Sequence, residues 1–163
     1  MRRHVALLLA ASLVGACAPA AEPPAVDTAT ETAAVDSVLT ALHTLAAAGD
    51  FDRYFDLFAT DAVFFGTDAT ERWTVDQFRG YASQSKGWTY DKTERHVFLD
   101  ADGHTAWFDE RLQNANYGET RGTGVLRKDE AGWKIVQYNL TIPIPNALAD
   151  SVVAQIRAMA PTQ

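Results

Sequence analysis

The chain contains a single cysteine, Cys17, among its 163 residues. A disulfide within the chain is therefore excluded, because a disulfide needs two thiols. Basic residues are also few. Without Arg2 and Arg3, 12 basic residues face 21 acidic ones, which is a net charge of −9 with His neutral. A nucleic acid partner is not expected, because phosphate neutralisation needs clustered Lys and Arg.

Several motifs of known chemistry are missing from the sequence. It has no Gly-rich nucleotide-binding motif and no Gly-x-Ser-x-Gly elbow of a Ser-His-Asp hydrolase. His43, His96 and His104, the histidines beyond the N-terminal region, show no metal-ligand spacing. We therefore expect no metal ion and no cofactor.

The longest apolar run lies near the N-terminus, from Val5 to Val14, and follows two arginines. It is too short to cross a bilayer as a helix and has the length of a signal peptide core. The segment Val14-Gly15-Ala16-Cys17 resembles a bacterial lipobox, whose cysteine becomes lipidated. We expect a signal peptide at 1–16 and lipidation of Cys17. The alternative is an ordinary secretory signal with an incidental cysteine.

Residues 17–30 are rich in Ala, Pro, Thr and Glu and lack the large apolar groups that a folded core needs. We interpret them as a flexible tether before a domain at 31–160. Ala18 is not the Asp of an inner-membrane retention signal. The expected location is therefore the cell envelope, on the outer membrane and facing the periplasm. The lipid anchor is the only membrane contact expected, because an acidic domain is repelled by an anionic surface.

Helices precede strands in the expected domain, which is typical of an α+β class. Apolar spacings of three and four predict helices at 32–48, 51–59, 75–83 and 147–159. Alternating patterns and turn residues predict a short strand at 62–66 and a four-strand antiparallel meander at 87–99, 104–114, 119–128 and 133–142.

The last strand changes character along one of its faces. Regular alternation places Trp133 and Ile135 on the same face as Gln137 and Asn139. A strand that crosses a core and then lines a cavity has this pattern. The alternative is that Gln137 and Asn139 face water.

Three stretches resemble one known family. They are Gly132-Trp133-Lys134-Ile135, the Gly49-Asp50 junction between two helices, and Gly66-Thr67-Asp68-Ala69-Thr70-Glu71-Arg72-Trp73. Together they resemble the SnoaL-like branch of the NTF2-like superfamily. The resemblance implies N-terminal helices packed on a curved antiparallel sheet around a conical pocket, here with an extra C-terminal helix. Such domains include isomerases, cyclases, dehydratases and many members without chemistry, so the resemblance leaves the function open.

The segment at 66–73 places three chemically rich groups on one loop. In a functional interpretation, Glu71 is a base, Arg72 binds an anion and Trp73 is a pocket wall. In a structural interpretation, Glu71 or Arg72 locks the loop and Trp73 seals the core.

The strand at 104–114 carries a second cluster. Glu110 shares a face with Ala106 and Phe108, while Trp107 and Asp109 share the other face. The sequence does not decide which face is concave. A carboxylate facing an apolar pocket has the raised pKa of a general base, and a rim ion pair is the alternative.

His96 is the only histidine inside a central strand, and a regular strand puts it on the face of Trp88 and Tyr90. A bulge would reverse that assignment. His96 is a candidate general base, with a half-buried structural role as the alternative. His43, on the first helix, is expected at the surface or between helices.

The leading hypothesis is a lipid-anchored domain that binds a small, partly apolar molecule. The alternatives are a cofactor-free isomerase, cyclase or hydrolase, and a module that dimerises through its sheet, as the resemblance implies. The amides Gln137 and Asn139 weaken the enzymatic alternative, because amides do not exchange protons near neutral pH. The catalytic candidates are Glu71, His96, Asp109 and Glu110. The ligand-binding candidates are Arg72, Trp73, Trp88, Tyr90, Trp107, Arg121, Gln137 and Asn139.

Overall fold

The structure is a computed structural model that describes residues 26–159. The predicted signal peptide, Cys17 and most of the predicted tether lie outside the described residues.

Two helices open the domain. The first, α1 (Thr28–Ala48), begins where the Asp27 carboxylate accepts a hydrogen bond from the Thr30 N–H, and it ends at Gly49, whose φ is +67°. It therefore starts within the segment that was predicted as a tether. The helix buries Val35, Leu39, Leu42, Leu45 and Ala46. The second helix, α2 (Phe51–Phe55), is capped by Asp50.

The predicted helix at 51–59 is wrong in its second half. The chain leaves α2 and enters β1 (Phe58–Phe65), three residues after Phe55. The Ile135 N–H donates to the Leu57 carbonyl, and Phe58 pairs with Ile135. Residues 51–59 are rich in apolar side chains, and this local pattern predicted one continuous helix. Pairing of Phe58 with the distant strand β6 overrides that preference.

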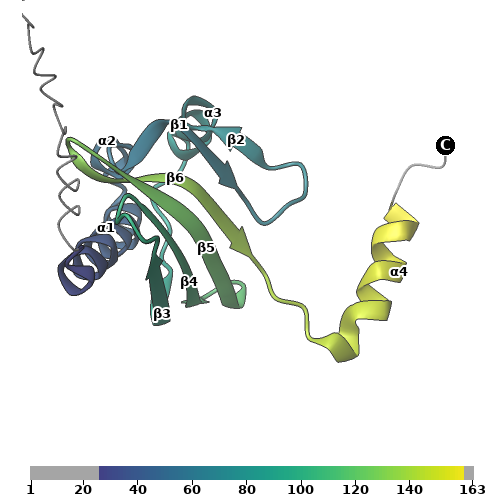
Figure 1. Ribbon diagram of the computed structural model, residues 1–163. Coiled ribbons are helices and arrows are strands. Elements are labelled where there is room, and N and C mark those ends of the chain that lie inside the picture. Colours follow the sequence, from purple (N-terminus) through teal and green to yellow (C-terminus); the bar gives the residue numbers. More distant parts are fainter. Residues whose placement is uncertain (1–25, 160–163) are drawn as a thin grey trace, which may run out of the picture.

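Six strands form one curved sheet in the order β2-β1-β6-β5-β4-β3 (Figure 1). The strands after β1 are β2 (Arg72–Thr74), β3 (Asp91–Leu99), β4 (Thr105–Asn114), β5 (Gly118–Asp129) and β6 (Gly132–Thr141). The meander from β3 to β6 is antiparallel, as predicted. The sheet is mixed rather than wholly antiparallel, because β1 runs parallel to β6.

Helices cover one face of this sheet. Helix α1 packs on β3 and β6, while α3 (Val75–Ala82) packs on β1 and β2. Thr74 and Gln77 form the predicted capping box at the start of α3. The core lies between these helices and the concave face, and it includes Leu39, Phe108, Leu126, Ile135 and Tyr138. The fold class is thus α+β, as expected.

Two of the register shifts in the sheet decide which side chains of β3 and β6 face the core. The pairing of β5 with β6 shifts between Ile135 and Gln137, and the pairing of β3 with β4 shifts between Lys92 and Glu94. Each shift inserts one extra residue, which exchanges the two faces of the strand beyond it. In β6, Trp133 and Ile135 are buried, but Tyr138 and Leu140 then take their place on the inner face.

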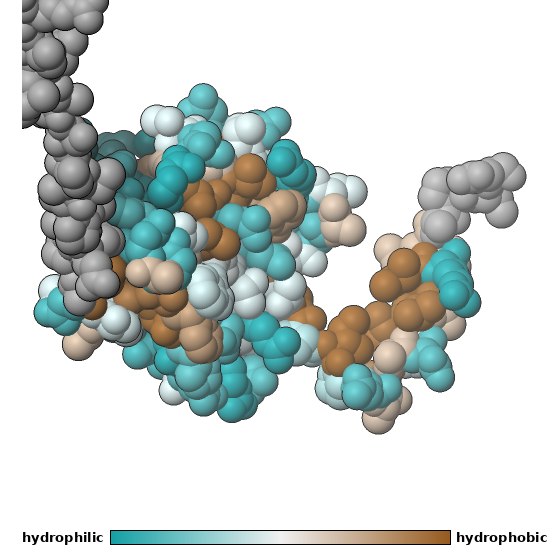
Figure 2. All heavy atoms as spheres, in the orientation of Figure 1, coloured by the Kyte–Doolittle hydropathy of each residue, from teal (hydrophilic) through white to brown (hydrophobic). Residues whose placement is uncertain are grey.

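The described residues end with a short 3-10 turn (Asn146–Leu148) and helix α4 (Ala149–Met159). Figure 1 shows α4 projecting away from the sheet, and Figure 2 shows apolar atoms along α4 and the segment before it. The exposed apolar residues of this region include Ile144, Leu148, Val153, Ile156 and Met159. No helix within residues 26–159 is long and apolar enough to cross a membrane.

Candidate functional site

An aromatic cavity of about 150 Å³ opens between α3, the loop after β1 and the segment before β3. It brings together four of the residues proposed from sequence, Glu71, Trp73, Trp88 and Tyr90. The remaining lining residues are Phe64, Gly66, Thr67, Phe78, Tyr81, Tyr117 and Leu140. Among residues 26–159, Glu71 is the only charged residue in this lining. The cavity therefore suits an uncharged or weakly polar ligand.

Stacked rings hold the wall of this cavity in place. The ring centroids of Phe64 and Phe78 are 3.9 Å apart, and those of Trp73 and Phe78 are 5.6 Å apart. Trp88 lies 5.8 Å from Phe78 on the other side. These aromatic pairs fix the rings in offset or tilted stacks, so the wall is formed before any ligand arrives.

The loop from Gly66 to Glu71, between β1 and β2, is closed by its own side chains. Glu71 Oε2 accepts a hydrogen bond of 3.1 Å from the Asp68 N–H, and the Asp68 carboxylate accepts one of 2.8 Å from the Thr70 N–H. Glu71 thus clamps the loop and lines the cavity at the same time. Arg72 does not join it, because its guanidinium lies exposed above the Phe65 ring at 5.9 Å.

Glu110 lies at the centre of a buried polar network beneath the aromatic cavity. Its carboxylate is 1% exposed. Oε1 lies 2.9 Å from His43 Nε2 and accepts a hydrogen bond of 2.8 Å from the Tyr138 hydroxyl. Oε2 accepts a hydrogen bond of 2.8 Å from Arg95 Nε. Burial raises the pKa of Glu110, but His43, Arg95 and Tyr138 together outweigh burial and hold the pKa below its usual value.

Arg95 links this network to the first helix. Its Nη1 donates to the Asp36 carboxylate at 2.8 Å and to the Asp36 carbonyl at 3.1 Å. The guanidinium is 2% exposed, so it is a buried cation between two carboxylates. Such a cation joins α1 to β3 and β4 and fixes the position of Glu110.

Gly122 makes room for the network on β5. A Cβ atom at this position would lie 2.7 Å from Glu110 Oε1 and would also collide with the Tyr138 hydroxyl. Only a glycine allows the two side chains to lie this close to the strand.

The other sheet face holds a second His–carboxylate pair. His96 Nδ1 lies 3.1 Å from Asp109 Oδ1, with side chains 52% and 48% exposed. The hydrogen bond to Asp109 raises the pKa of His96, and Glu94 adds to the effect. The prediction that His96 shares a face with Trp88 and Tyr90 is wrong. The extra residue at Thr93 turns His96 outward. Trp88 and Tyr90 lie before the start of β3.

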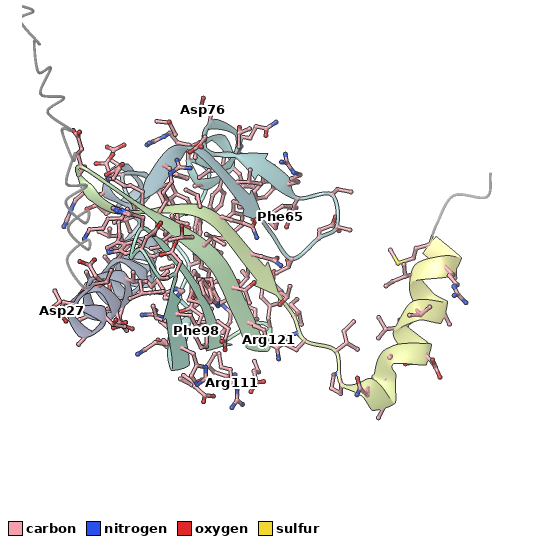
Figure 3. All side chains as sticks on the ribbon, in the orientation of Figure 1. Asp27, Phe65, Asp76, Phe98, Arg111 and Arg121 are labelled. Carbon is pink, nitrogen blue, oxygen red and sulfur yellow. The ribbon has the colours of Figure 1, made fainter. Side chains whose placement is uncertain are left out.

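Four further predicted site residues lie on this outer face, away from the cavity. Trp107 stacks on Phe98 with ring centroids 5.8 Å apart, and both rings are 45% exposed. Figure 3 shows Phe98, Arg111 and Arg121 on neighbouring strands of the sheet. Gln137 and Asn139 face outward because of the bulge in β6. The prediction that these two line the cavity is wrong, and the argument that their amides weaken acid–base chemistry no longer applies. The outward-facing candidates are Trp107, Arg121, Gln137 and Asn139.

A comparison of the sequence with protein-family models finds a match. The matching family is described as a SnoaL-like domain, and the match covers residues 35–145. The chain belongs to the SnoaL-like domain family. No curated protein matches the chain.

Solved structures share the fold of this SnoaL-like domain. An uncharacterised protein with a cystatin-like fold from Caulobacter vibrioides is 17% identical, with a TM-score of 0.63 over 77% of this chain and 99% of that one. A proposed aromatic ring hydroxylase from Novosphingobium aromaticivorans is 19% identical, with a TM-score of 0.61 over 72% and 92%. A proposed dehydratase of the NTF2-like family from Streptomyces avermitilis is 15% identical, with a TM-score of 0.61 over 72% and 99%. At these identities the likeness shows the fold alone.

Sequence reasoning missed His43 as a member of the site. It was expected at the surface or between helices, but it contacts Glu110 and its side chain is 14% exposed. One signal was present: His43 lies four residues after Leu39, at the edge of the buried stripe of α1. Within residues 26–159, the SnoaL-like domain has no cluster of three or more His, Cys, Asp or Glu side chains that could hold a metal ion.

Proposed function

We propose that this SnoaL-like domain binds a small, partly apolar molecule in its aromatic cavity and is held at the cell envelope by a lipid on Cys17. The size and the aromatic lining of the cavity are the observations that support ligand binding. Its volume of about 150 Å³ is that of a cavity which accepts a single benzene-sized ring. Its walls are stacked aromatic side chains, which bind planar rings by the same offset contacts.

Ligand binding is tested on the purified full-length chain. Native mass spectrometry reveals a co-purified small molecule, and fluorescence titration with single-ring compounds measures affinity. Trp88→Ala is expected to weaken binding at least about tenfold, because Trp88 lines the cavity. Trp107→Ala is the matched control, since this tryptophan lies on the outer face. Equal effects of the two variants would contradict the cavity as the site.

The anchor is tested separately from the cavity. Cys17 follows small residues at the end of an apolar run, so Cys17→Ser is expected to move the protein from the membrane fraction to the soluble fraction. Immunoblotting of the two fractions measures this. A Cys17→Ser protein that stays with the membrane would refute the lipid anchor without affecting the binding proposal.

A second candidate function is cofactor-free acid–base catalysis, and the His43–Glu110 contact favours it. A carboxylate only accepts hydrogen bonds, so His43 Nε2 is the donor in this contact, and in the neutral imidazole Nδ1 is the atom that can accept a proton. His43 borders the interior of the cone. A base in this position can take a proton from a carbon next to a carbonyl and return it, as isomerases do.

Hydrogen exchange provides a test that needs no known substrate. Cyclohexanone in D2O loses its α-hydrogens when a base removes them, and NMR follows the loss. The wild-type protein is expected to accelerate exchange above the buffer rate, and His43→Gln to abolish the acceleration. His96→Gln, on the outer face, is the control that retains it. Exchange at the buffer rate in the wild type would remove the enzymatic candidate for ketones.

A further inference from the structure

A second, smaller cavity adjoins the aromatic cavity at the floor of the cone. Its volume is about 20 Å³, which is room for one water-sized group and too little for a ring. Phe64, Trp88, Tyr90 and Leu140 line both cavities, so the two share a wall and lie side by side. We call this smaller space the floor cavity.

The floor cavity differs from the aromatic cavity in its polar groups. His43, Tyr54, Tyr90 and Tyr138 all contribute to its lining. The three phenols are close enough to influence one another. Burial raises the pKa of all three, to about 12 for Tyr90, and Tyr54 adds to the effect on Tyr138. All three therefore remain neutral phenols that can donate and accept hydrogen bonds.

Two of these hydroxyls lack a protein partner. Tyr138 donates its proton to Glu110. In the part of the chain that the structure describes, no hydrogen bond involves the hydroxyl of Tyr54 or of Tyr90. Tyr54 is nonetheless 2% exposed. Among residues 26–159, the Tyr54 hydroxyl is not one of the fully buried polar atoms that lack a partner, so it is open to the floor cavity. A polar atom from outside the protein can therefore form a hydrogen bond with it.

We propose that the floor cavity binds one oxygen atom of the ligand, a hydroxyl or a carbonyl, while the ring to which it is attached lies in the aromatic cavity. This inference rests on the proposed function and adds the ligand class: neutral single-ring compounds with one terminal oxygen, such as phenols and cyclic ketones. A carboxylate is excluded, because the floor has room for one polar atom and Glu110 beside it is already an anion.

Phenol and toluene distinguish this inference from simple apolar binding, because they share one ring and differ in a hydroxyl or a methyl group. A wholly apolar cavity prefers toluene, since a hydroxyl without a partner is costly to bury. A floor cavity that binds oxygen reverses this order. Isothermal titration of the full-length wild-type chain is expected to give phenol at least about tenfold tighter than toluene, and benzoate weaker than both.

Tyr54→Phe tests the named hydroxyl, and Tyr117→Phe is its matched control. Tyr117 lines the aromatic cavity but not the floor cavity, and it is half exposed. Tyr54→Phe is expected to lower the preference for phenol over toluene several-fold, while Tyr117→Phe leaves the preference unchanged. Thermal melts establish that both variants fold. The comparison of phenol with toluene on the wild-type protein does not depend on either variant.

The outcomes separate the two proposals. Toluene binding as tightly as phenol, or tighter, overturns the floor cavity as an oxygen site but leaves ring binding intact. A preference for phenol that survives in Tyr54→Phe at full strength also overturns it. If neither compound binds, and no other single-ring compound does, the proposed function fails and this inference fails with it.

Discussion

Neighbouring residues of β4 form two His–carboxylate pairs on opposite faces of the sheet. Glu110 contacts His43 at 2.9 Å on the inner face, and Asp109 contacts His96 at 3.1 Å on the outer face. The distances are similar, but the surroundings are not. The inner carboxylate is buried with a cation and a phenol, whereas half of each outer side chain meets water.

The difference teaches that distance alone does not make a site. Around the inner pair, water is excluded, so each hydrogen bond and charge acts at low dielectric and fixes the geometry. Around the outer pair, water and salt screen the same attraction. The inner pair is therefore a rigid group at the floor of a cavity, and the outer pair is a surface feature.

The largest contrast is expected from removing each carboxylate. Glu110→Ala leaves Arg95 buried beside an empty space, and such a loss lowers the free energy of unfolding by about 3–5 kcal/mol. Asp109→Ala, one residue along the same strand, is expected to leave that free energy nearly unchanged. Urea denaturation measures both. Similar losses in the two variants would mean that the inner network is no more important than the outer pair.

Two glycines allow the buried network to be compared with an exposed surface: Gly122 lies against the network, and Gly80 lies on an exposed helix. An added methyl at Gly122 meets Glu110 and Tyr138, while one at Gly80 meets nothing within 4 Å. Gly122→Ala is expected to destabilise the protein by about 1–3 kcal/mol through overpacking. Gly80→Ala, in an exposed helix, is expected to stabilise it by about 0.5–1 kcal/mol. Thermal melts measure whether each variant is less or more stable than the wild type. An unchanged melting temperature for Gly122→Ala would show that Glu110 and Tyr138 can move aside without loss of stability.

Acid should act on the inner pair. The pKa of Glu110 in the folded protein lies below its usual value of 4.5. Its stabilising contribution is thus complete above about pH 4.5 and is lost as pH falls through the lower, folded value. The melting temperature of Glu110→Gln is expected to fall less steeply with acid than that of the wild type. Asp109→Asn is the control, and an unchanged acid slope in Glu110→Gln would contradict the assigned pKa direction.

The smallest effect concerns the outer pair. The pKa of His96 is raised above 6.5 by Asp109, so its contribution is present below that value and is lost as pH rises through the folded pKa. NMR titration of the His96 ring proton is expected to show a raised pKa that returns toward 6.5 in Asp109→Asn. The pKa of His96 should be insensitive to Glu110→Gln, and a response to that change would link the two faces.

The sequence by itself determined the class of the fold and most of its elements. The apolar stripe of α1, the capping box at Thr74 and the four-strand meander are local patterns, and their elements were predicted within four residues of the observed bounds. Burial of Trp133 and Ile135 was predicted correctly as well. Periodicity and capping act within a few residues, so the sequence displays them directly.

Only the tertiary structure decided which residues meet in the cone. One extra residue in each of β3 and β6 turned His96, Gln137 and Asn139 outward, and no turn residue or proline marks either bulge. His43 and Glu110 are 67 residues apart in the chain, and they meet because α1 packs across the concave face on β3 and β6. Which face a strand residue occupies, and where a helix packs, both depend on contacts between distant segments. A one-residue shift in strand pairing moves a side chain to the opposite face of the sheet.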